Sequence, residues 1–210
     1  MRKSNGEIAA EIRERICLLG GADEIILHEG QLATEFGVSR TPIRQVLQML
    51  AYENLVETRS GVGTIATPLL IDRRESDFRA FRAILAACVH CPADNASVPG
   101  LALDRLRDAR RLLAASTGAD PTLVKTVAAY LEAMLLLVGD HIVATALRSA
   151  FWRHVRWCLH PRHGNMAEAR DHFAEAIADA VPLAEAGDPK ALLARLAALD
   201  VGGGEGWYLG

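Results

Sequence analysis

The stretch FGVSRTPIRQVLQMLAYENL, residues 36–55, has the pattern of one helix with two unlike faces. An apolar repeat at the spacing of a single buried helix face is formed by Ile43, Val46, Leu47 and Leu50. The opposite face carries groups that reach phosphates and base edges in nucleic-acid complexes, namely Arg40, Thr41, Arg44, Gln45 and Gln48. An ordinary solvated helix face has the same composition, so this helix alone leaves both readings open.

The beginning of this helix is marked by two residues. We expect Ser39 at the N-cap, because its hydroxyl can accept an unpaired backbone N–H of the first turn. Pro42 is tolerated in that turn, since its missing N–H costs little there. The pattern therefore predicts a helix from about Arg40 to about Tyr52.

Shorter elements flank this helix. Upstream, Leu32, Ala33 and Phe36 have helical spacing, and Gly37 follows as a suitable C-cap. Two helices joined by a short turn that contains Gly form a helix-turn-helix. Downstream, LVETRSGVGTIAT reads as strand, turn at residues 60–63, and strand, which predicts a β-hairpin. Together these elements predict a winged helix-turn-helix, whose core would be closed by an earlier helix bearing Ile8, Ile12, Ile16 and Leu19.

Residues 27–67 strongly resemble the DNA-binding domain of GntR-family bacterial transcription regulators. The family pattern, L-x-E-x-x-L-A-x-x-x-G-V-S-R-x-P-[VI]-R-x-[AV]-L-x-x-L followed by a Leu-Val strand and a G-x-G wing, is matched by Leu27, Glu29, Leu32, Ala33, Gly37, Val38, Ser39, Arg40, Pro42, Arg44, Leu47, Leu50, Leu55, Val56, Gly61 and Gly63. The resemblance implies that Arg40, Thr41 and Arg44 contact DNA, and that Gly63 lets the wing approach the minor groove. The family often places Arg after the motif glutamate, whereas this chain has Gly30, so one expected operator contact is missing.

The bulk charge of the chain does not favour DNA binding. The chain has a net charge of -3, and residues 1–70 hold seven Lys/Arg against nine Asp/Glu. Affinity for phosphate must therefore come from local clustering of Arg40, Arg44 and Arg59 with helix N-termini. The candidate DNA-contacting residues are Ser39, Arg40, Thr41, Arg44, Gln45, Gln48, Arg59 and Gly63.

The rest of the chain predicts an all-helical second part. The fold class is mostly α, with domain 1–68 carrying the β-hairpin wing, a linker at 69–75, an all-helical bundle at 76–200 and a flexible tail at 201–210. Breaks rich in Gly, Pro, Asp and Asn separate helices that we expect near 75–91, 100–116, 121–138, 141–159, 165–184 and 188–199. A length of 210 residues is enough for two small cores.

Residues 130–143, YLEAMLLLVGDHIV, together with DHFAEAIADA and AGDPKALLARL nearer the end, resemble the FadR-like C-terminal domain, the effector-binding and dimerising bundle of one large GntR branch. Many members of that branch bind a divalent metal through one Asp and three His. Alignment on this pattern leaves His172 as the one candidate ligand, and puts apolar residues at the other three positions, Val127, Leu131 and Leu199. Apolar side chains cannot ligate a metal, so we expect neither metal nor cofactor.

An apolar pocket is the alternative use of that space. We hypothesise an effector with a substantial apolar portion and one anionic end, oriented by Tyr130, Arg148 and His172. Arg148, Arg153 and Arg156 follow one helix and could form an ion-paired face or point inward to hold an anion. A different reading makes the helical domain a dimerisation or protein-interaction module without an effector.

Two Cys/His clusters, CVHC at 88–91 and HVRWCLHPRH at 154–163, could form a zinc site or a redox pair if their faces met. Their spacing is not that of a zinc finger, and free Cys is a common core residue. A metal-dependent enzyme would have to rest on these clusters, since the sequence has no G-x-S-x-G motif, phosphate-binding loop or recognisable carboxylate pair. We therefore expect a protein that is not an enzyme, with its four Cys reduced.

The resemblance implies a homodimeric transcription regulator whose partner is operator DNA. A two-fold dimer matches a pseudo-palindromic operator. The chain has no apolar run of membrane-spanning length and no apolar signal region near its beginning, which favours a cytoplasmic protein without membrane contact. Whether the protein acts as a repressor or an activator, and on which genes, stays open.

Overall fold

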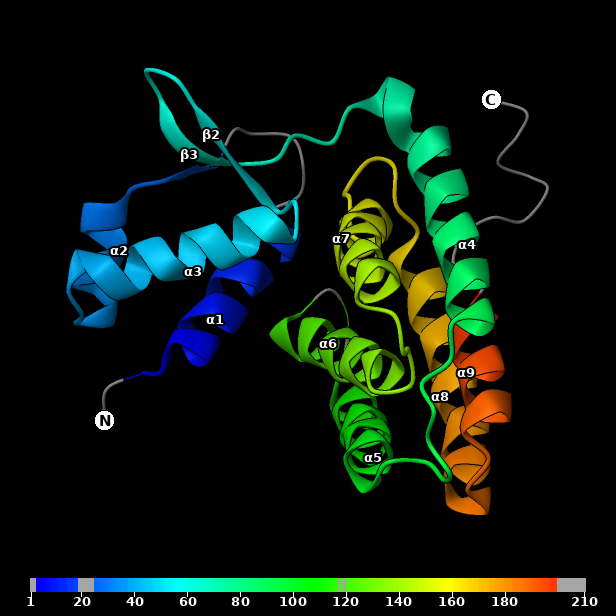
Figure 1. The fold of residues 1–210 in the computed structure, drawn as a ribbon. Coiled ribbons are helices and arrows are strands. Elements are labelled where there is room, and N and C mark those ends of the chain that lie inside the picture. The colour runs from blue at the N-terminus through cyan, green and yellow to red at the C-terminus, as the bar shows by residue number, and fades with distance from the viewer. Residues whose placement is uncertain (1–2, 19–24, 117, 119, 200–210) are drawn as a thin grey trace.

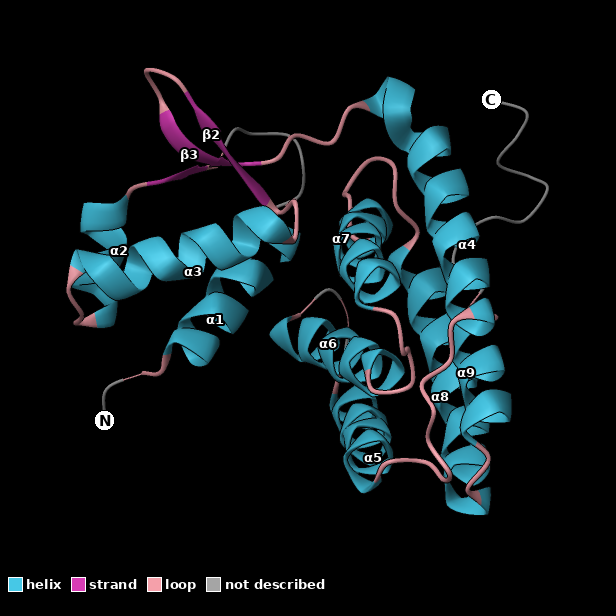
Figure 2. Cartoon of the chain, in the orientation of Figure 1, coloured by secondary structure: helices cyan, strands magenta, loops and turns pink. Residues whose placement is uncertain are grey.

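The computed structural model describes residues 3–18, 25–116, 118 and 120–199 (Figure 1). Within that part of the chain, a small N-terminal group of helices carries a sheet, and a larger group is entirely helical (Figure 2). The predicted fold class, a winged helix-turn-helix followed by a helical bundle, is confirmed. The predicted flexible tail at 201–210 lies outside the described residues.

The N-terminal elements follow the predicted order. They are α1 (Asn5–Leu18), β1 (Ile26–Leu27), α2 (Glu29–Phe36), α3 (Arg40–Tyr52), β2 (Val56–Arg59) and β3 (Gly63–Ala66). Helix α1 packs on α3, and the predicted apolar repeats of both helices are buried between them. Ile8, Ile12 and Ile16 supply the α1 side of this core, while the fourth predicted residue, Leu19, lies outside the described residues.

The sheet contains one strand that the sequence did not reveal. Strands β2 and β3 form the predicted antiparallel hairpin, with Val56 opposite Ala66 and Arg59 opposite Gly63. Strand β1 pairs antiparallel with the other edge of β3, so the strand order is β1-β3-β2. Two residues are too short to show alternation in a sequence, and β1 was therefore missed.

The end of α2 and the beginning of α3, which meet at the turn of the helix-turn-helix, are capped differently. Gly37 ends α2 in the left-handed conformation with φ 63°, as predicted. Ser39 occupies the N-cap of α3 with extended backbone, but its hydroxyl accepts no capping hydrogen bond, so this part of the prediction was wrong. A capping hydroxyl accepts from the second or third residue of the helix, and the third residue here is Pro42, which has no N–H.

The helical part begins with a 3-10 turn at Ile71–Arg73. The helices that follow are α4 (Arg74–His90), α5 (Gly100–Ala115), α6 (Pro121–Leu135), α7 (His141–Cys158), α8 (Met166–Ala186) and α9 (Pro189–Ala197). Acidic and amide side chains cap α6, α7, α8 and α9, accepting first-turn N–H groups at Asp120, Asp140, Asn165 and Asp188. Helix α6 ends three residues before the predicted 138, because Leu137 and Gly139 pair with residues 91–93 instead.

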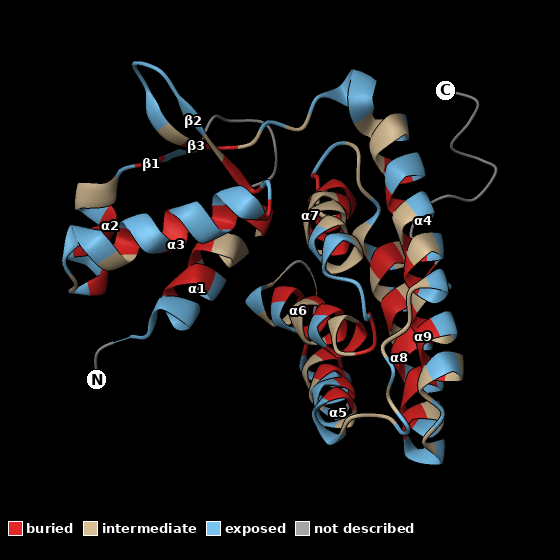
Figure 3. Ribbon diagram, viewed as in Figure 1, coloured by how far each residue is buried: buried red, intermediate tan, exposed pale blue. Residues whose placement is uncertain are grey.

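Helix α7 lies at the centre of the molecule. It packs against α4 and α6 of the bundle and also contacts α1 of the N-terminal domain (Figure 1). Buried residues therefore occur around much of its circumference (Figure 3). Phe151 stacks on Tyr130 of α6 at 6.4 Å and meets Phe173 of α8 edge-on at 6.1 Å between ring centroids. These aromatic rings form the core that joins α6, α7 and α8.

Candidate nucleic-acid interface

The exposed face of α3 carries the residues that the sequence singled out. Its opposite face is buried against α1, whereas the candidate side is open to solvent (Figure 3) at Ser39, Arg40, Thr41, Arg44, Gln45 and Gln48. The α2–α3 turn lies at the end of the N-terminal domain farthest from the helical bundle (Figure 1). The beginning of α3, which carries both arginines, is therefore accessible to a large partner.

Arg44 is oriented by a carboxylate from the neighbouring helix. Its Nε and Nη2 donate to the two Glu29 carboxylate oxygens at 3.1 and 2.9 Å. The Arg44 hydrogen bonds lower the pKa of Glu29, and Glu29 in turn raises the pKa of Arg44. The Arg44 side chain is 61% exposed, and an exposed pair of this kind contributes little to stability. Glu29 thus orients the guanidinium, while most of the Arg44 side chain stays exposed to solvent.

Arg40 lies across the first turn of α2, next to Gly30. Its Nη2 would be 3.5 Å from a Cβ at position 30. Within the described part of the chain, Arg40 makes no hydrogen bond or ion pair. A Cβ at that distance would make an ordinary van der Waals contact, so the Arg40 guanidinium lies beside Gly30, the position where the family often has an arginine. The sequence did not indicate this approach, because it depends on the angle between two helices.

Gln45 of α3 forms a hydrogen bond with α1. Its Oε1 accepts a hydrogen bond from Asn5 Nδ2 at 3.0 Å, at the N-terminal end of α1. This contact fixes the amide orientation, so that its NH₂ group faces away from Asn5. Thr41 and Gln48 are exposed on the same side of α3.

The wing supplies the remaining two candidates. Arg59 ends β2 and forms an exposed ion pair with Glu57 at 3.2 Å. Gly63 lies opposite Arg59 and has a backbone φ of 114°, and Gly61 in the turn has a φ of 77°. Residues with a Cβ rarely adopt these backbone conformations. The backbone of the wing tip can thus turn tightly and approach a surface closely. The tip projects away from the bundle (Figure 1).

The three candidate effector residues occupy different settings. Tyr130 is fully buried, its hydroxyl donates to the Leu196 carbonyl at 2.7 Å, and burial raises its pKa. Arg148 donates to Glu132 at 2.8 Å on the surface. His172 is partly exposed, and its Nδ1 has no hydrogen-bond partner among the described residues. Tyr130 thus serves the core, and the geometry does not gather these three side chains around one ligand.

The positions aligned with the family's metal ligands do not fit a metal. Val127, Leu131 and Leu199 are buried apolar residues. Among the described residues, no group of three or more His, Cys, Asp or Glu side chains is placed to hold an ion. Cys158 Sγ lies 3.3 Å from His154 Nε2, and burial raises the pKa of this thiol to about 12. A buried thiol of such high pKa is poorly reactive.

The arginines of α7 are engaged by the chain itself. Arg148 pairs with Glu132, as described, and Arg153 Nη1 lies 3.3 Å from Asp77 Oδ1. Arg156 is only 5% exposed, and its Nη1 donates to the Thr67 carbonyl directly after β3 at 2.7 Å. Arg156 thus ties α7 to the segment that leaves the wing, a role that the spacing of arginines in the sequence did not indicate.

The described helices include none that is long and apolar enough to cross a membrane.

Comparison with known proteins gives matches for the N-terminal region. Residues 5–65 match the family model of bacterial regulatory proteins of the gntR family. An HTH-type transcriptional regulator in an unstable DNA locus of Streptomyces ambofaciens is 35% identical over 66 residues, which are 31% of this chain. The chain matches only 28% of the length of that relative.

Two solved structures resemble the chain over nearly its whole length. McbR/YncC of E. coli aligns with a TM-score of 0.52 and 14% identity, covering 94% of each chain. A GntR transcriptional regulator from Rhodococcus sp. RHA1 aligns with a TM-score of 0.51 and 19% identity, covering 92% of this chain and 93% of that one. At these identities, the likeness shows the fold alone.

Proposed function

We propose that this chain, whose N-terminal domain belongs to the GntR family of bacterial regulatory proteins, is a transcription regulator that binds a pseudo-palindromic operator as a homodimer. The observation that carries the proposal is the open face of α3, where Arg40 and Arg44 stand one turn apart above a fully buried apolar face. Operator DNA as the partner also places the site of action in the cytoplasm.

The chemistry of this face suits direct readout of bases. An arginine can donate two hydrogen bonds to O6 and N7 of guanine, and a glutamine can pair with N6 and N7 of adenine. Arg40 and Arg44 are our candidates for guanine, and Gln45 and Gln48 for adenine. Ser39 and Thr41 stand at the N-terminal end of α3, where hydroxyls and backbone N–H groups bind phosphate.

The wing adds a second contact on the DNA backbone. Arg59 would exchange its exposed partner for a phosphate, and Gly63 would let the tip approach the minor groove. Few cations are available in this domain, so we expect only a moderate dependence of affinity on salt.

The proposal of a dimer rests on the number of base pairs that one domain can contact. One winged domain contacts too few base pairs to find its site among a genome's competitors, whereas a two-fold dimer doubles the readout. We propose that the helical bundle supplies most of the interface. Light scattering on the full chain should give twice the mass of one chain at tens of micromolar, an order chosen to exceed ordinary dimer constants.

Selection of bound sequences from random DNA tests the function. We expect an enriched inverted repeat whose half-sites lie about one helical turn apart. The absence of any enriched sequence would contradict the proposal, and a single asymmetric site would contradict the dimer. Footprinting on the selected DNA should then protect both half-sites.

We further propose that the helical part responds to a small molecule with an apolar portion. The alternative is a bundle that only dimerises or binds a protein partner. One observation favours it: the hydroxyl of Tyr130, a candidate effector contact, already donates a hydrogen bond to the Leu196 carbonyl. Thermal-shift screening of the full chain against metabolites separates the two, because a true ligand stabilises the folded state by mass action.

A further inference from the structure

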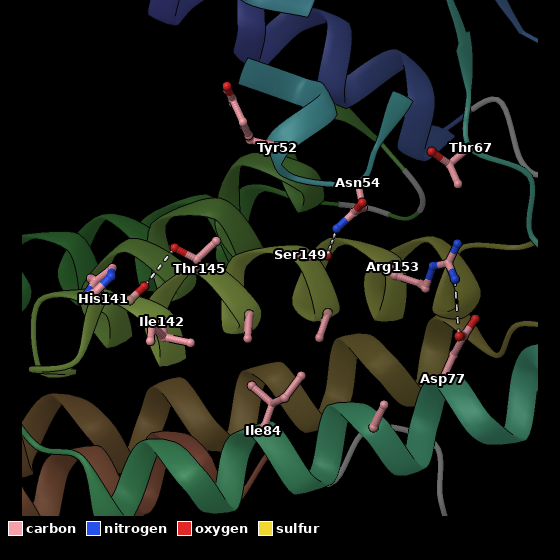
Figure 4. Close-up of a pocket in the computed structure, with 13 residues that line it drawn as sticks. Tyr52, Asn54, Thr67, Asp77, Ile84, His141, Ile142, Thr145, Ser149 and Arg153 are labelled. Carbon is pink, nitrogen blue, oxygen red and sulfur yellow. Dashed lines mark hydrogen bonds and ion pairs between the residues drawn. The ribbon is translucent and has the colours of Figure 1, made fainter. Parts of the chain in front are cut away.

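A groove of about 710 Å³ lies where the N-terminal domain meets the helical bundle (Figure 4). Helices α7 and α4 form its length, and the end of α3 with the segments after α3 and β3 closes one side. This volume is in the usual range of small-molecule sites, which often occur at domain interfaces. The groove is separate from the bundle centre that Tyr130, Phe151 and Phe173 fill.

The floor of the groove is apolar and elongated. Ala80 and Ile84 of α4 and Ala146 and Ala150 of α7 line it, and the small alanine side chains keep the space open. Ile142 extends the apolar surface at the far end and is 67% exposed. The α7 residues that line the groove run from 141 to 153, which corresponds to about 18 Å of helix.

An arginine and a histidine mark the two ends of this floor. Arg153 uses one guanidinium nitrogen for Asp77, at 3.3 Å, and makes no other hydrogen bond among the described residues. Asp77, the one lining carboxylate, also accepts a hydrogen bond from Trp157 Nε1 at 2.9 Å. His141 lines the opposite end. The remaining N–H groups of Arg153 therefore favour a bound molecule that carries an anionic group.

We propose that this groove binds an elongated amphipathic organic anion, with its apolar body over Ala80, Ile84 and Ala150 and its anionic end at Arg153. A planar guanidinium with unused N–H groups suits a carboxylate or sulfonate, which accept from two donors. The apolar floor gives such a molecule affinity through burial, while the cation fixes its direction.

An occupant would touch both domains at once. Tyr52, at the end of the DNA-binding helix, is 80% exposed above the groove, and Asn54 Nδ2 donates to Ser149 Oγ at 2.7 Å across the junction. A ligand there has different contacts in each arrangement of the two domains and therefore shifts their populations. This consequence rests on the proposed DNA-binding function, whereas the binding site itself does not.

The test uses 8-anilinonaphthalene-1-sulfonate, an aromatic apolar molecule with one sulfonate, and its uncharged analogue N-phenyl-1-naphthylamine. Fluorescence titrations of the full chain without DNA give the affinity for each probe. Ala80→Trp fills the groove from an exposed position, and Ala178→Trp, an exposed alanine of α8 outside the groove, is its matched control. Circular dichroism confirms that each variant is folded.

We expect saturable sulfonate binding in the natural chain and in Ala178→Trp, with a loss of about tenfold or more in Ala80→Trp, because a Trp occupies the apolar floor. Arg153→Gln should weaken the sulfonate by about tenfold and leave the uncharged probe within about twofold, since only the former loses a charged partner. Equal affinity in all variants, or no sulfonate binding to the natural chain, overturns the proposal.

Operator affinity is measured separately, without either probe. If the natural chain binds operator but Ala80→Trp and Ala178→Trp bind the sulfonate with equal affinity, the groove proposal is wrong and the proposed regulator function stands. If the natural chain binds the sulfonate in the groove but selects no DNA sequence, the proposed regulator function is wrong and the groove proposal stands.

Discussion

Helix α3 carries Arg40 and Arg44 on a face open to solvent, whereas α7 buries His154 and Arg156 among its neighbours. Both helices are amphipathic in sequence, yet their polar residues serve different partners. On α3, most or all of the arginine N–H groups make no hydrogen bond within the described part of the chain. On α7, the imidazole lies between Phe78 and Phe81, and the guanidinium binds a backbone carbonyl.

The comparisons cover the two regions differently. A family model matches residues 5–65 of the N-terminal region. The likeness to solved structures extends over nearly the whole chain, at 14% and 19% identity. Low identity is compatible with one fold, because a buried helix only has to fill space and satisfy its polar atoms, which many residue combinations achieve.

The largest expected effect is on the stability of the bundle. Phe151→Ala should lower the free energy of unfolding by about 3–5 kcal/mol, because it opens a cavity beside Tyr130 and Phe173. Urea unfolding followed by circular dichroism measures this loss. Phe151→Leu should cost less, since it keeps most of the volume. A loss below about 1 kcal/mol in Phe151→Ala would show that the core is not packed as described.

Acid should weaken the bundle through His154. Burial, assisted by the charges of Arg82 and Arg74, lowers the pKa of this imidazole to about 3 from its usual 6.5. Between these values the unfolded chain takes up a proton that the folded chain does not. Stability contributed here is therefore complete above about pH 6.5 and is lost as the pH falls below it, by up to about 1.4 kcal/mol per unit.

The variant His154→Phe separates this effect from other titrations. It keeps the ring contacts with Phe78 and Phe81 but cannot bind a proton. Urea unfolding at pH 7.5 and at about pH 5 should show a smaller acid loss in the variant than in the natural chain. An identical loss in both proteins would mean that His154 is not buried as a neutral group. Glu29, which pairs with Arg44, should not contribute in this range, because Arg44 lowers its pKa.

The smallest expected effect is that of a chelator on thermal stability. Val127, Leu131 and Leu199 offer no lone pairs at the aligned ligand positions, so a chelator should shift the thermal midpoint by less than about 1 °C. Elemental analysis of protein purified without chelator should find zinc, nickel and manganese well below one ion per chain. One tightly held ion per chain would contradict this and direct attention to Cys88, Cys91 and Cys158.

The fold was predictable where a local pattern determines it. The apolar repeats of α1 and α3, and the Gly and Asp residues at helix ends, gave the helices within about three residues. The open face of α3 followed from the same periodicity. Strand β1 was not predictable, because its two residues carry no pattern and depend on pairing with β3.

The parts of the candidate sites that sequence reasoning missed are contacts between distant segments. The approach of Arg40 to Gly30, the hydrogen bond from Arg156 to Thr67 and the groove beside Ser149 all arise from how helices pack. Tyr130, which the alignment suggested as a ligand contact, lies on a helix that turns its ring into the core, where its hydroxyl donates to the Leu196 carbonyl. Periodicity shows that a face is buried, but not which segment covers it.

The most direct test of the account is operator binding by the double variant Arg40→Ala, Arg44→Ala. Each guanidinium that pairs with a guanine contributes about 1–3 kcal/mol, so fluorescence anisotropy with the selected operator should show a loss of at least about tenfold. The midpoint of urea unfolding should stay nearly unchanged, because both side chains are exposed and their one described ion pair lies at the surface. Unchanged operator affinity in a folded double variant would contradict the assignment of α3 as the helix that reads DNA.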